Sequence, residues 1–203
     1  VELIHYSLGL AFEHLEYLVK ELTQEQADWL PPGNANPIGS LYWHTVGYVD
    51  QLTHEWCMAP FREITAEEYL EAKLAKRDLG MGQTPLRHSA GWQEKVVIAL
   101  PPENPIDPYW DVRAVREGLR VNLPALHNYA QATAQTLQSW IPTLALEDLE
   151  RTIPTPIGDH SLGQFLEIFI VSHINNHIGE ISALKGCLGL KGYPWGSPSD
   201  FME

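Results

Sequence analysis

The stretch SLGQFLEIFIVSHINNHIGEISALKGCL, residues 161–188, carries the most regular apolar pattern of the chain. Its apolar side chains recur at steps of three and four residues, the spacing of one buried face of an α-helix. The positions that share this face are Leu162, Leu166, Phe169, Ile170, His173, His177, Ile181, Leu184 and Leu188. Ser161 and Gln164 have the spacing of a capping box, so we expect a long helix that begins there and ends through Gly186, Gly189 and Gly192.

Two histidines, His173 and His177, interrupt this apolar face. A neutral imidazole is tolerated in a core only if its ring nitrogens find partners. Because the two rings lie one helical turn apart, both can reach the same cation. The alternative is that both are core residues hydrogen-bonded to carbonyl oxygens, or that they line a solvated groove, since short motifs such as H-x-x-x-H recur by chance.

The length and charge of the chain limit its class. With 203 residues, it can bury one sizeable core, so we expect a single domain over residues 1–203. Lys and Arg number 13 against 26 Asp and Glu, which gives a formal charge of −13. That charge would repel phosphate backbones and anionic membrane surfaces. We therefore expect neither a nucleic acid nor a membrane as a partner.

The cysteines and the start of the chain indicate a compartment. Cys57 and Cys187 are the only cysteines and form no C-x-x-C pair, which argues against a disulfide scaffold and a thiolate zinc site. The first residues include Glu2 and His5 and form no basic leader, and no segment approaches about 18 consecutive apolar residues. We therefore expect a soluble, cytoplasmic protein.

Three further segments have helical spacing. Residues 3–22 form the first, and a loop rich in proline and glycine separates it from a second helix over residues 40–58. We expect the third to follow Asp111 and to run to Trp140, with a kink at Pro124. Its predicted buried positions are Leu119, Leu123, Leu126, Tyr129, Ala130, Thr133 and Leu137.

Residues 59–108 mix charged stretches with glycine and proline. We interpret them as an insertion of loops and short helices, the latter at Ala66–Ala75 and Leu86–Ala99. The tail at residues 192–203 has no regular pattern. Four long helices predict an all-α four-helix bundle. Because the connection between helices two and three is long enough to span the bundle, we expect a crossover there in place of a simple meander.

A third metal ligand has a candidate in the second predicted helix. Two imidazoles alone would hold a cation weakly, so the hypothesis needs a ligand from another helix. His44 lies one turn into that helix, on the same face as Leu41 and Tyr48. Three neutral imidazoles around zinc, nickel or ferrous iron leave a coordination position for water or substrate.

The segments SLYWHTVGYVDQLTHEW and HSLGQFLEIFIVSHINNHIGEISALKGCLG resemble the DinB-like family of metal-binding four-helix bundles. In that family, one histidine near the start of helix two joins an H-x-x-x-H pair on helix four. The resemblance covers most of the chain outside the insertion and implies His44, His173 and His177 as ligands of a divalent metal ion. Family members with known activity include thiol-dependent S-transferases and a mycothiol-dependent maleylpyruvate isomerase.

The resemblance implies a metal-dependent enzyme that activates a low-molecular-weight thiol for attack on a small electrophilic substrate. With water in place of the thiol, the same site could hydrolyse an amide or ester. Glu180 could orient a ligand imidazole or accept a proton, and its alternative is an exposed helix carboxylate. Tyr48 and Asn176 are candidates for contact with substrate or cofactor.

A second hypothesis remains open beside the enzyme. The chain could be a non-catalytic, stress-related bundle that keeps the metal site for stability or for ligand capture. An open coordination position beside a pocket favours the enzyme, whereas a site sealed by side chains favours the second hypothesis. The resemblance also allows a homodimer through helix faces.

Overall fold

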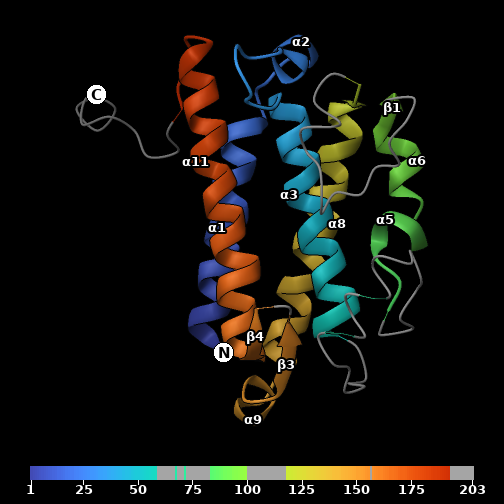
Figure 1. Ribbon diagram of the computed structural model, residues 1–203, viewed down its shortest axis with the longest axis vertical. Coiled ribbons are helices and arrows are strands. Elements are labelled where there is room, and N and C mark those ends of the chain that lie inside the picture. The colour runs from blue at the N-terminus through green and yellow to red at the C-terminus, as the bar shows by residue number, and fades with distance from the viewer. Residues whose placement is uncertain (59–66, 68–70, 72–82, 100–117, 156, 193–203) are drawn as a thin grey trace, which may run out of the picture.

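The computed structural model describes residues 1–58, 67, 71, 83–99, 118–155 and 157–192, and these residues are mostly helical, as predicted (Figure 1). The four long helices are α1 (Glu2–Val19), α3 (Ile38–Leu52), α8 (Leu123–Trp140) and α11 (Ser172–Cys187). The shorter helical elements are α2 (Gln24–Asp28), η1 (Thr53–Cys57), α5 (Leu86–Ser89), α6 (Trp92–Val96), η2 (Ile141–Thr143), α9 (Leu146–Leu149), α10 (Leu162–Phe165) and η3 (Leu166–Val171). The described strands form two antiparallel pairs, β1 (Val97–Ala99) with β2 (Arg120–Val121), and β3 (Thr152–Thr155) with β4 (Gly158–Ser161).

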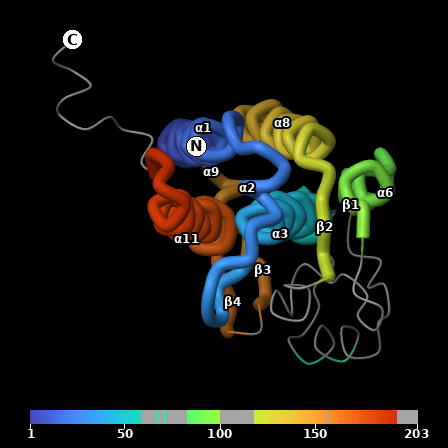
Figure 2. Tube along the Cα trace, turned by 90° about the horizontal axis from the view of Figure 1, so that it is seen from above, coloured from blue at the N-terminus to red at the C-terminus, as the bar shows by residue number. Residues whose placement is uncertain are grey.

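The four long helices pack side by side. α1 contacts α8 and α11, and α3 contacts the same two helices, so α1 and α3 lie at opposite corners when seen from above (Figure 2). Figure 1 shows α1 and α11 running in one direction and α3 and α8 in the other. α3 and α8 are thus parallel and are joined by a long connection. Most of that connection lies outside the described residues.

The helix predicted from residues 161–188 is present as the continuous run of α10, η3 and α11. It begins at the predicted capping box, where the Ser161 hydroxyl accepts from the Gln164 N–H at 3.2 Å and the Gln164 side chain accepts from the Ser161 N–H at 2.9 Å. The π-helical turn η3 was not predicted. A π turn holds more residues than an α turn and so rotates the side chains that follow. After it, Ile174 is fully buried, and His173 and His177 lie at the edge of the core.

The core lies between the four long helices. The buried positions predicted for the third helix are all buried, namely Leu119, Leu123, Leu126, Tyr129, Ala130, Thr133 and Leu137. Leu3, which shares the apolar spacing of the first helix, is instead 76% exposed in the first turn of α1. Within the described part of the chain, no helix combines the length and the apolar character needed to cross a membrane.

The predicted start and kink of the third helix are wrong. α8 begins at Leu123, and the Asn122 side chain caps it by accepting from the Ala125 N–H at 3.0 Å. Pro124 therefore lies in the first turn, where its missing N–H has no helical partner to lose, and it does not kink the helix. The two residues of β2 precede the cap, and residues 112–117 lie outside the described part.

The insertion is also divided differently from the prediction. The helix predicted at Leu86–Ala99 is wrong as a single element, because Gly91, at φ +64°, separates α5 from α6 and the last three residues form β1. The helix predicted at Ala66–Ala75 lies outside the described residues, except for Glu67 and Glu71. The tail beyond residue 192 lies outside them as well.

The hairpin of β3 and β4 was missed. Its strands pair with Thr152 opposite Ser161 and Thr155 opposite Gly158. Gly158 has φ +119°, a backbone conformation that favours glycine. The hairpin leads directly into the cap of α10, and it therefore sets where the C-terminal helix begins.

Gly39 is a close-packing position that a substitution can test. A Cβ there would lie 3.1 Å from Val121 Cγ2 and 3.2 Å from the carbonyl oxygen of Ala27. Although alanine is the better helix former by about 1 kcal/mol, Gly39→Ala is expected to lower the free energy of unfolding by about 1–2 kcal/mol, because the α2 backbone has to move. Urea denaturation measures this loss. Gly186→Ala, in a helix and with no atom within 4 Å of its Cβ, is the control, and an equal loss there would contradict the packing argument.

Candidate metal centre

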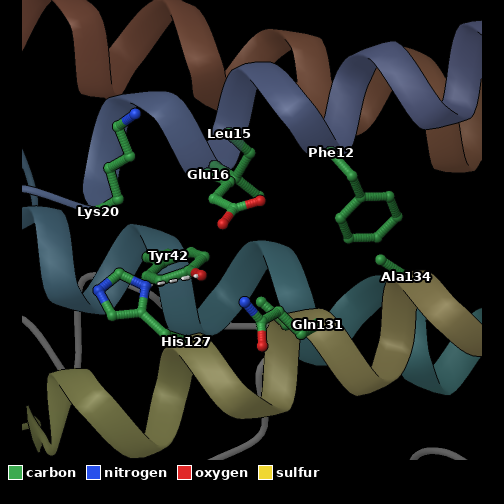
Figure 3. Close-up of a pocket in the computed structure, with 9 residues that line it drawn as sticks. Phe12, Leu15, Glu16, Lys20, Tyr42, His127, Gln131 and Ala134 are labelled. Atoms are coloured by element: carbon green, nitrogen blue, oxygen red, sulfur yellow. Dashed lines mark hydrogen bonds between the residues drawn. The ribbon is translucent and has the colours of Figure 1, made fainter.

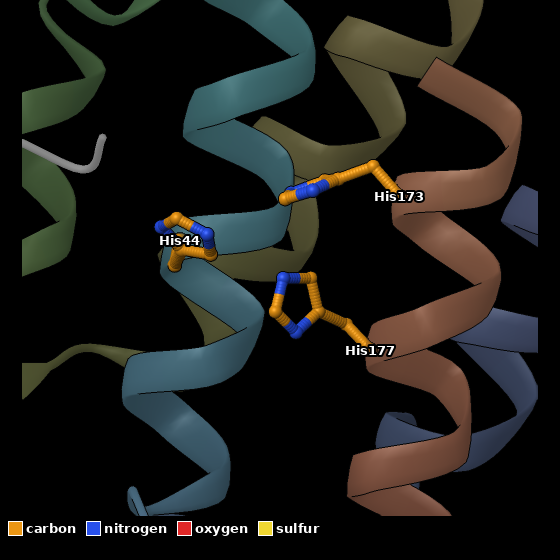
Figure 4. A group of neighbouring side chains, drawn as sticks. All are labelled: His44, His173 and His177. Atoms are coloured by element: carbon orange, nitrogen blue, oxygen red, sulfur yellow. The ribbon is translucent and has the colours of Figure 1, made fainter. Parts of the chain in front are cut away.

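The neighbouring helices α3 and α11 bring the three predicted metal ligands together. His44 comes from α3, and His173 and His177 from α11 (Figure 4). Each offers one ring nitrogen, and these three nitrogens lie within 4.8 Å of one another. A tetrahedral zinc ion with bonds of about 2.0–2.1 Å places its ligand nitrogens roughly 3.4 Å apart, so small side-chain movements close the remaining gap. The cluster could therefore hold a metal ion.

One nitrogen of the cluster fits this use especially well. His173 Nε2 is buried and has no hydrogen-bond partner among the described residues. A buried polar atom without a partner is costly and needs an explanation. A bond to a metal ion would satisfy the lone pair, so the donor set of the cluster fits a cation.

The charge state of His173 also suits coordination. Burial lowers the pKa of His173 to about 2, and the neighbouring rings of His177 and His44 act in the same direction. The ring is therefore neutral at ordinary pH, and only neutral imidazole binds a metal.

Glu180 holds the ring of His177. The distance from His177 Nδ1 to Glu180 Oε2 is 2.6 Å, across three residues of α11. A carboxylate that accepts from Nδ1–H orients the imidazole and leaves Nε2 with the free lone pair. The Glu180 side chain is 56% exposed, whereas that of His177 is 14% exposed. The carboxylate therefore lies on the solvent side of the cluster.

Tyr48 contacts the histidine cluster, whereas Asn176 is exposed to solvent. The Tyr48 ring stacks on the His173 ring, with 4.0 Å between centroids and 24° between planes. Burial raises the pKa of Tyr48, so its hydroxyl stays protonated. Asn176 lies on the exposed side of α11 and makes no hydrogen bond to the three histidines in the described part of the chain. Of the two predicted contact residues, the structure places only Tyr48 against a ring of the histidine cluster.

A buried polar network on α3 was not found from the sequence. Both carboxylate oxygens of Asp50 are used, because they accept from the backbone N–H groups of Leu86 and Arg87, each at 2.9 Å, and from the Tyr129 hydroxyl at 2.6 Å. His54 Nδ1 lies 2.9 Å from Asp50 Oδ1. The network joins α3 to α5 and α8. It therefore supports the helix that carries His44.

The charges of this network stabilise each other. Burial alone would raise the pKa of Asp50, but hydrogen bonds from His54, Tyr129 and two backbone N–H groups outweigh it and lower the pKa below its usual value. Burial would likewise lower the pKa of His54, but its contacts with Asp50 outweigh that effect and raise it. The contact between Asp50 and His54 could have been predicted from the sequence, because residues four apart in a helix lie on the same face.

Comparison with known proteins relates most of the chain to a family and to a fold. The sequence profile of the DinB superfamily matches residues 8–181, a span that contains all three histidines. No curated protein matches the chain. The chain is similar to a solved structure described as the crystal structure of the conserved protein of locus from Enterococcus faecalis, with 17% identity and a TM-score of 0.62. The likeness covers 93% of this chain and 96% of that one, and at this identity it shows the fold alone.

Proposed function

The chain belongs to the DinB superfamily, and on this premise we propose that it is a metal-dependent enzyme whose ion is held by His44, His173 and His177. The observation that carries the proposal is the meeting of three ring nitrogens, one from each histidine, within 4.8 Å. The buried Nε2 of His173, which has no hydrogen-bond partner among the described residues, supports it. Zinc, nickel and ferrous iron all accept imidazole, so the proposal covers these three divalent ions.

The arrangement of the helices supports this site. We infer that the four packed long helices form a four-helix bundle with a crossover between the second and third, because α3 and α8 run in the same direction. In such a bundle, the ligands come from two helices that are far apart in sequence. Metal binding would then link α3 to α11 and stabilise the folded state.

The residues around the triplet suit a reaction of a small molecule. When bound, the ion supplies Lewis acidity, which lowers the pKa of a thiol or a water molecule enough for attack at neutral pH. Glu180 orients the His177 ring, and its exposed carboxylate is available to accept a proton. Tyr48 covers one face of His173 and can donate a hydrogen bond, since its hydroxyl stays protonated. The 14% exposure of the His177 side chain supports an open site over a sealed one.

We propose a low-molecular-weight thiol as the nucleophile and a small electrophile as the second substrate, with hydrolysis by water as the other reaction of the same site. The net charge of −13 supports a small-molecule partner over a nucleic acid or membrane surface. A cytoplasmic location and assembly as a homodimer belong to the same proposal, and Leu3 and Tyr6, exposed by 76% and 68%, mark a helix face to test for the dimer.

The test is turnover by the metal-loaded protein. The protein is freed of metal, reloaded with zinc, nickel or ferrous iron, and assayed with several thiols against 1-chloro-2,4-dinitrobenzene and with nitrophenyl esters and anilides. We expect turnover that requires the metal and is lost in His173→Ala. Metal binding without any turnover would favour the non-catalytic bundle that captures a metal or ligand. Equal turnover with and without the metal would contradict the proposal.

Glu180 offers a milder perturbation of the same site. Because loss of a carboxylate behind a ligand histidine typically weakens metal binding about 10–100-fold, Glu180→Gln is expected to weaken zinc binding by that factor. Competition with a chromophoric chelator measures the affinity. Glu147→Gln, which changes an exposed carboxylate on α9, is the matched control and should bind zinc as the wild type does. An unchanged affinity in Glu180→Gln would show that the 2.6 Å contact has no part in holding the ion.

A further inference from the structure

A cavity of about 260 Å³ lies between α1, α3 and α8, away from the histidine cluster (Figure 3). Tyr42 of α3 lines it together with residues of α1 and α8, whereas His44 of the same helix meets α11. Two residues along an α-helix turn a side chain by about 200°, so Tyr42 and His44 point to opposite sides of α3. The cavity is therefore separate from the proposed metal site.

Part of the wall of this cavity is apolar. Phe12 and Leu15 come from α1, and Ala130 and Ala134 from the facing side of α8. The two alanines leave space that larger side chains would fill. An apolar group placed there would be removed from water, which stabilises it by about 25 cal/mol per Å² of buried surface. The volume lies slightly below the about 300 Å³ at which pockets for drug-sized ligands begin, so a ligand has to be small.

One end of the cavity is polar. Tyr42 is 2% exposed, and its hydroxyl lies 3.3 Å from His127 Nδ1. Burial lowers the pKa of His127, so its ring is neutral. If the hydroxyl donates to Nδ1, the oxygen of Tyr42 keeps its lone pairs for a donor inside the cavity.

Glu16 places a negative charge at this end. Figure 3 shows its carboxylate pointing from α1 toward the Tyr42 hydroxyl. Lys20, one turn further along α1, also lines the cavity, but its ammonium lies 5.2 Å from the centre of the Tyr17 ring, and Figure 3 shows it directed away from Tyr42. Among the described residues, no cation lies within 4.0 Å of the Glu16 carboxylate. The polar end of the cavity therefore offers a carboxylate and a hydroxyl oxygen as acceptors, and the amide of Gln131 also lines the cavity.

We propose that this cavity binds a small molecule that joins an apolar body to a primary ammonium group. The ammonium lies between Glu16 and Tyr42 and donates to both, and the apolar body lies against Phe12, Leu15 and the two alanines. An anion is disfavoured by the Glu16 carboxylate, since the Lys20 ammonium points away from Tyr42 (Figure 3). A neutral ligand of the same shape leaves that carboxylate without a charged partner.

The probe for this site is benzylamine, with benzyl alcohol and benzoate as ligands of the same shape and different charge. Binding is followed by calorimetry and by NMR shifts of the full-length protein. We expect benzylamine to bind with a Kd of about 1 mM or tighter. Benzyl alcohol is expected to bind about tenfold more weakly, because its single uncharged O–H can donate to only one of the two acceptors, and benzoate is expected not to bind.

Four variants locate the binding. Glu16→Gln is expected to weaken benzylamine about tenfold, and Glu13→Gln, an exposed carboxylate on the same helix that does not line the cavity, to leave it unchanged. Ala134→Phe should remove binding by filling the cavity. His173→Ala should bind benzylamine normally, which separates this site from the metal centre. Failure of benzylamine to bind would overturn the proposal, as would equal affinity for benzyl alcohol. An unchanged affinity in Glu16→Gln would overturn it as well. Because Glu16 is exposed, this variant should fold, and it tests the proposal even if Ala134→Phe does not fold.

Discussion

Replacement of Asp50 by alanine is expected to lower the free energy of unfolding by about 3–5 kcal/mol, the range for breaking a buried charged pair. Asp50 is fully buried, and its carboxylate accepts from the Tyr129 hydroxyl and from the N–H groups of Leu86 and Arg87 while contacting His54. Its removal leaves several buried donors without an acceptor, each a costly loss. Chemical denaturation measures the change.

Asp159→Ala is the control for this prediction. Asp159 is exposed in the hairpin of β3 and β4, so its loss should change stability by less than about 0.5 kcal/mol. A similar, small effect of both substitutions would contradict the role assigned to the network. A large effect at Asp50 alone would show that α3 depends on its contacts with α5 and α8.

The same network predicts how stability depends on pH. The pKa of Asp50 is lowered, so its contribution is present above the ordinary value of 3.8 and is lost as the pH falls through the folded-state pKa. The pKa of His54 is raised, so its contribution is present below 6.5 and is lost as the pH rises through the folded-state pKa. The difference in stability between wild type and Asp50→Asn should therefore be largest between pH 3.8 and 6.5. A difference that grew steadily on either side of this window would contradict the assignment.

Loss of His173 is expected to have the largest effect on metal binding. Structural zinc sites bind with about 10–16 kcal/mol shared by four ligands, so one ligand is worth about 3 kcal/mol, or roughly a hundredfold in affinity. His173→Ala should weaken zinc binding by at least that factor. His127→Ala removes a histidine of α8 outside the cluster and should leave the affinity unchanged. Retained zinc stoichiometry and affinity in His173→Ala would contradict the site.

The same variant has a second readout in stability. A ligand that binds only the folded state raises stability by about 2.7 kcal/mol at a hundred times its Kd. Zinc should therefore raise the melting temperature of the wild type and of His127→Ala. At the same concentration, a hundredfold weaker affinity leaves only about 0.4 kcal/mol of stabilisation, so the melting temperature of His173→Ala should rise much less. This comparison detects binding even where the affinity is too high for direct titration.

The sequence was sufficient to predict the helical class and the meeting of His44 with His173 and His177. Periodicity places each histidine on an inward or edge-facing position of its own helix, and the family pattern relates the two helices. The π turn η3 was not predicted because its apolar residues also fit the spacing of an α-helix. The sequence pattern does not reveal the extra rotation that a π turn gives to the side chains after it.

Other errors have local causes. The kink expected at Pro124 followed from placing the helix start too early in the sequence. Helical apolar spacing extends before residue 122, and it concealed the Asn122 cap at which α8 begins. The hairpin of β3 and β4 is short, and its proline and glycine are equally typical of a turn. The Asp50 network joins residues 36 and 79 positions apart, and a single sequence carries no signal for such pairs.

The most direct measurement is the anomalous difference map of a crystal of the zinc-loaded protein, recorded at the zinc absorption edge. We predict one peak about 2.0–2.1 Å from a ring nitrogen of each of His44, His173 and His177, with a further coordination position taken by a small molecule. A fully loaded crystal whose zinc lies elsewhere, or contacts only one of the three rings, would contradict the account.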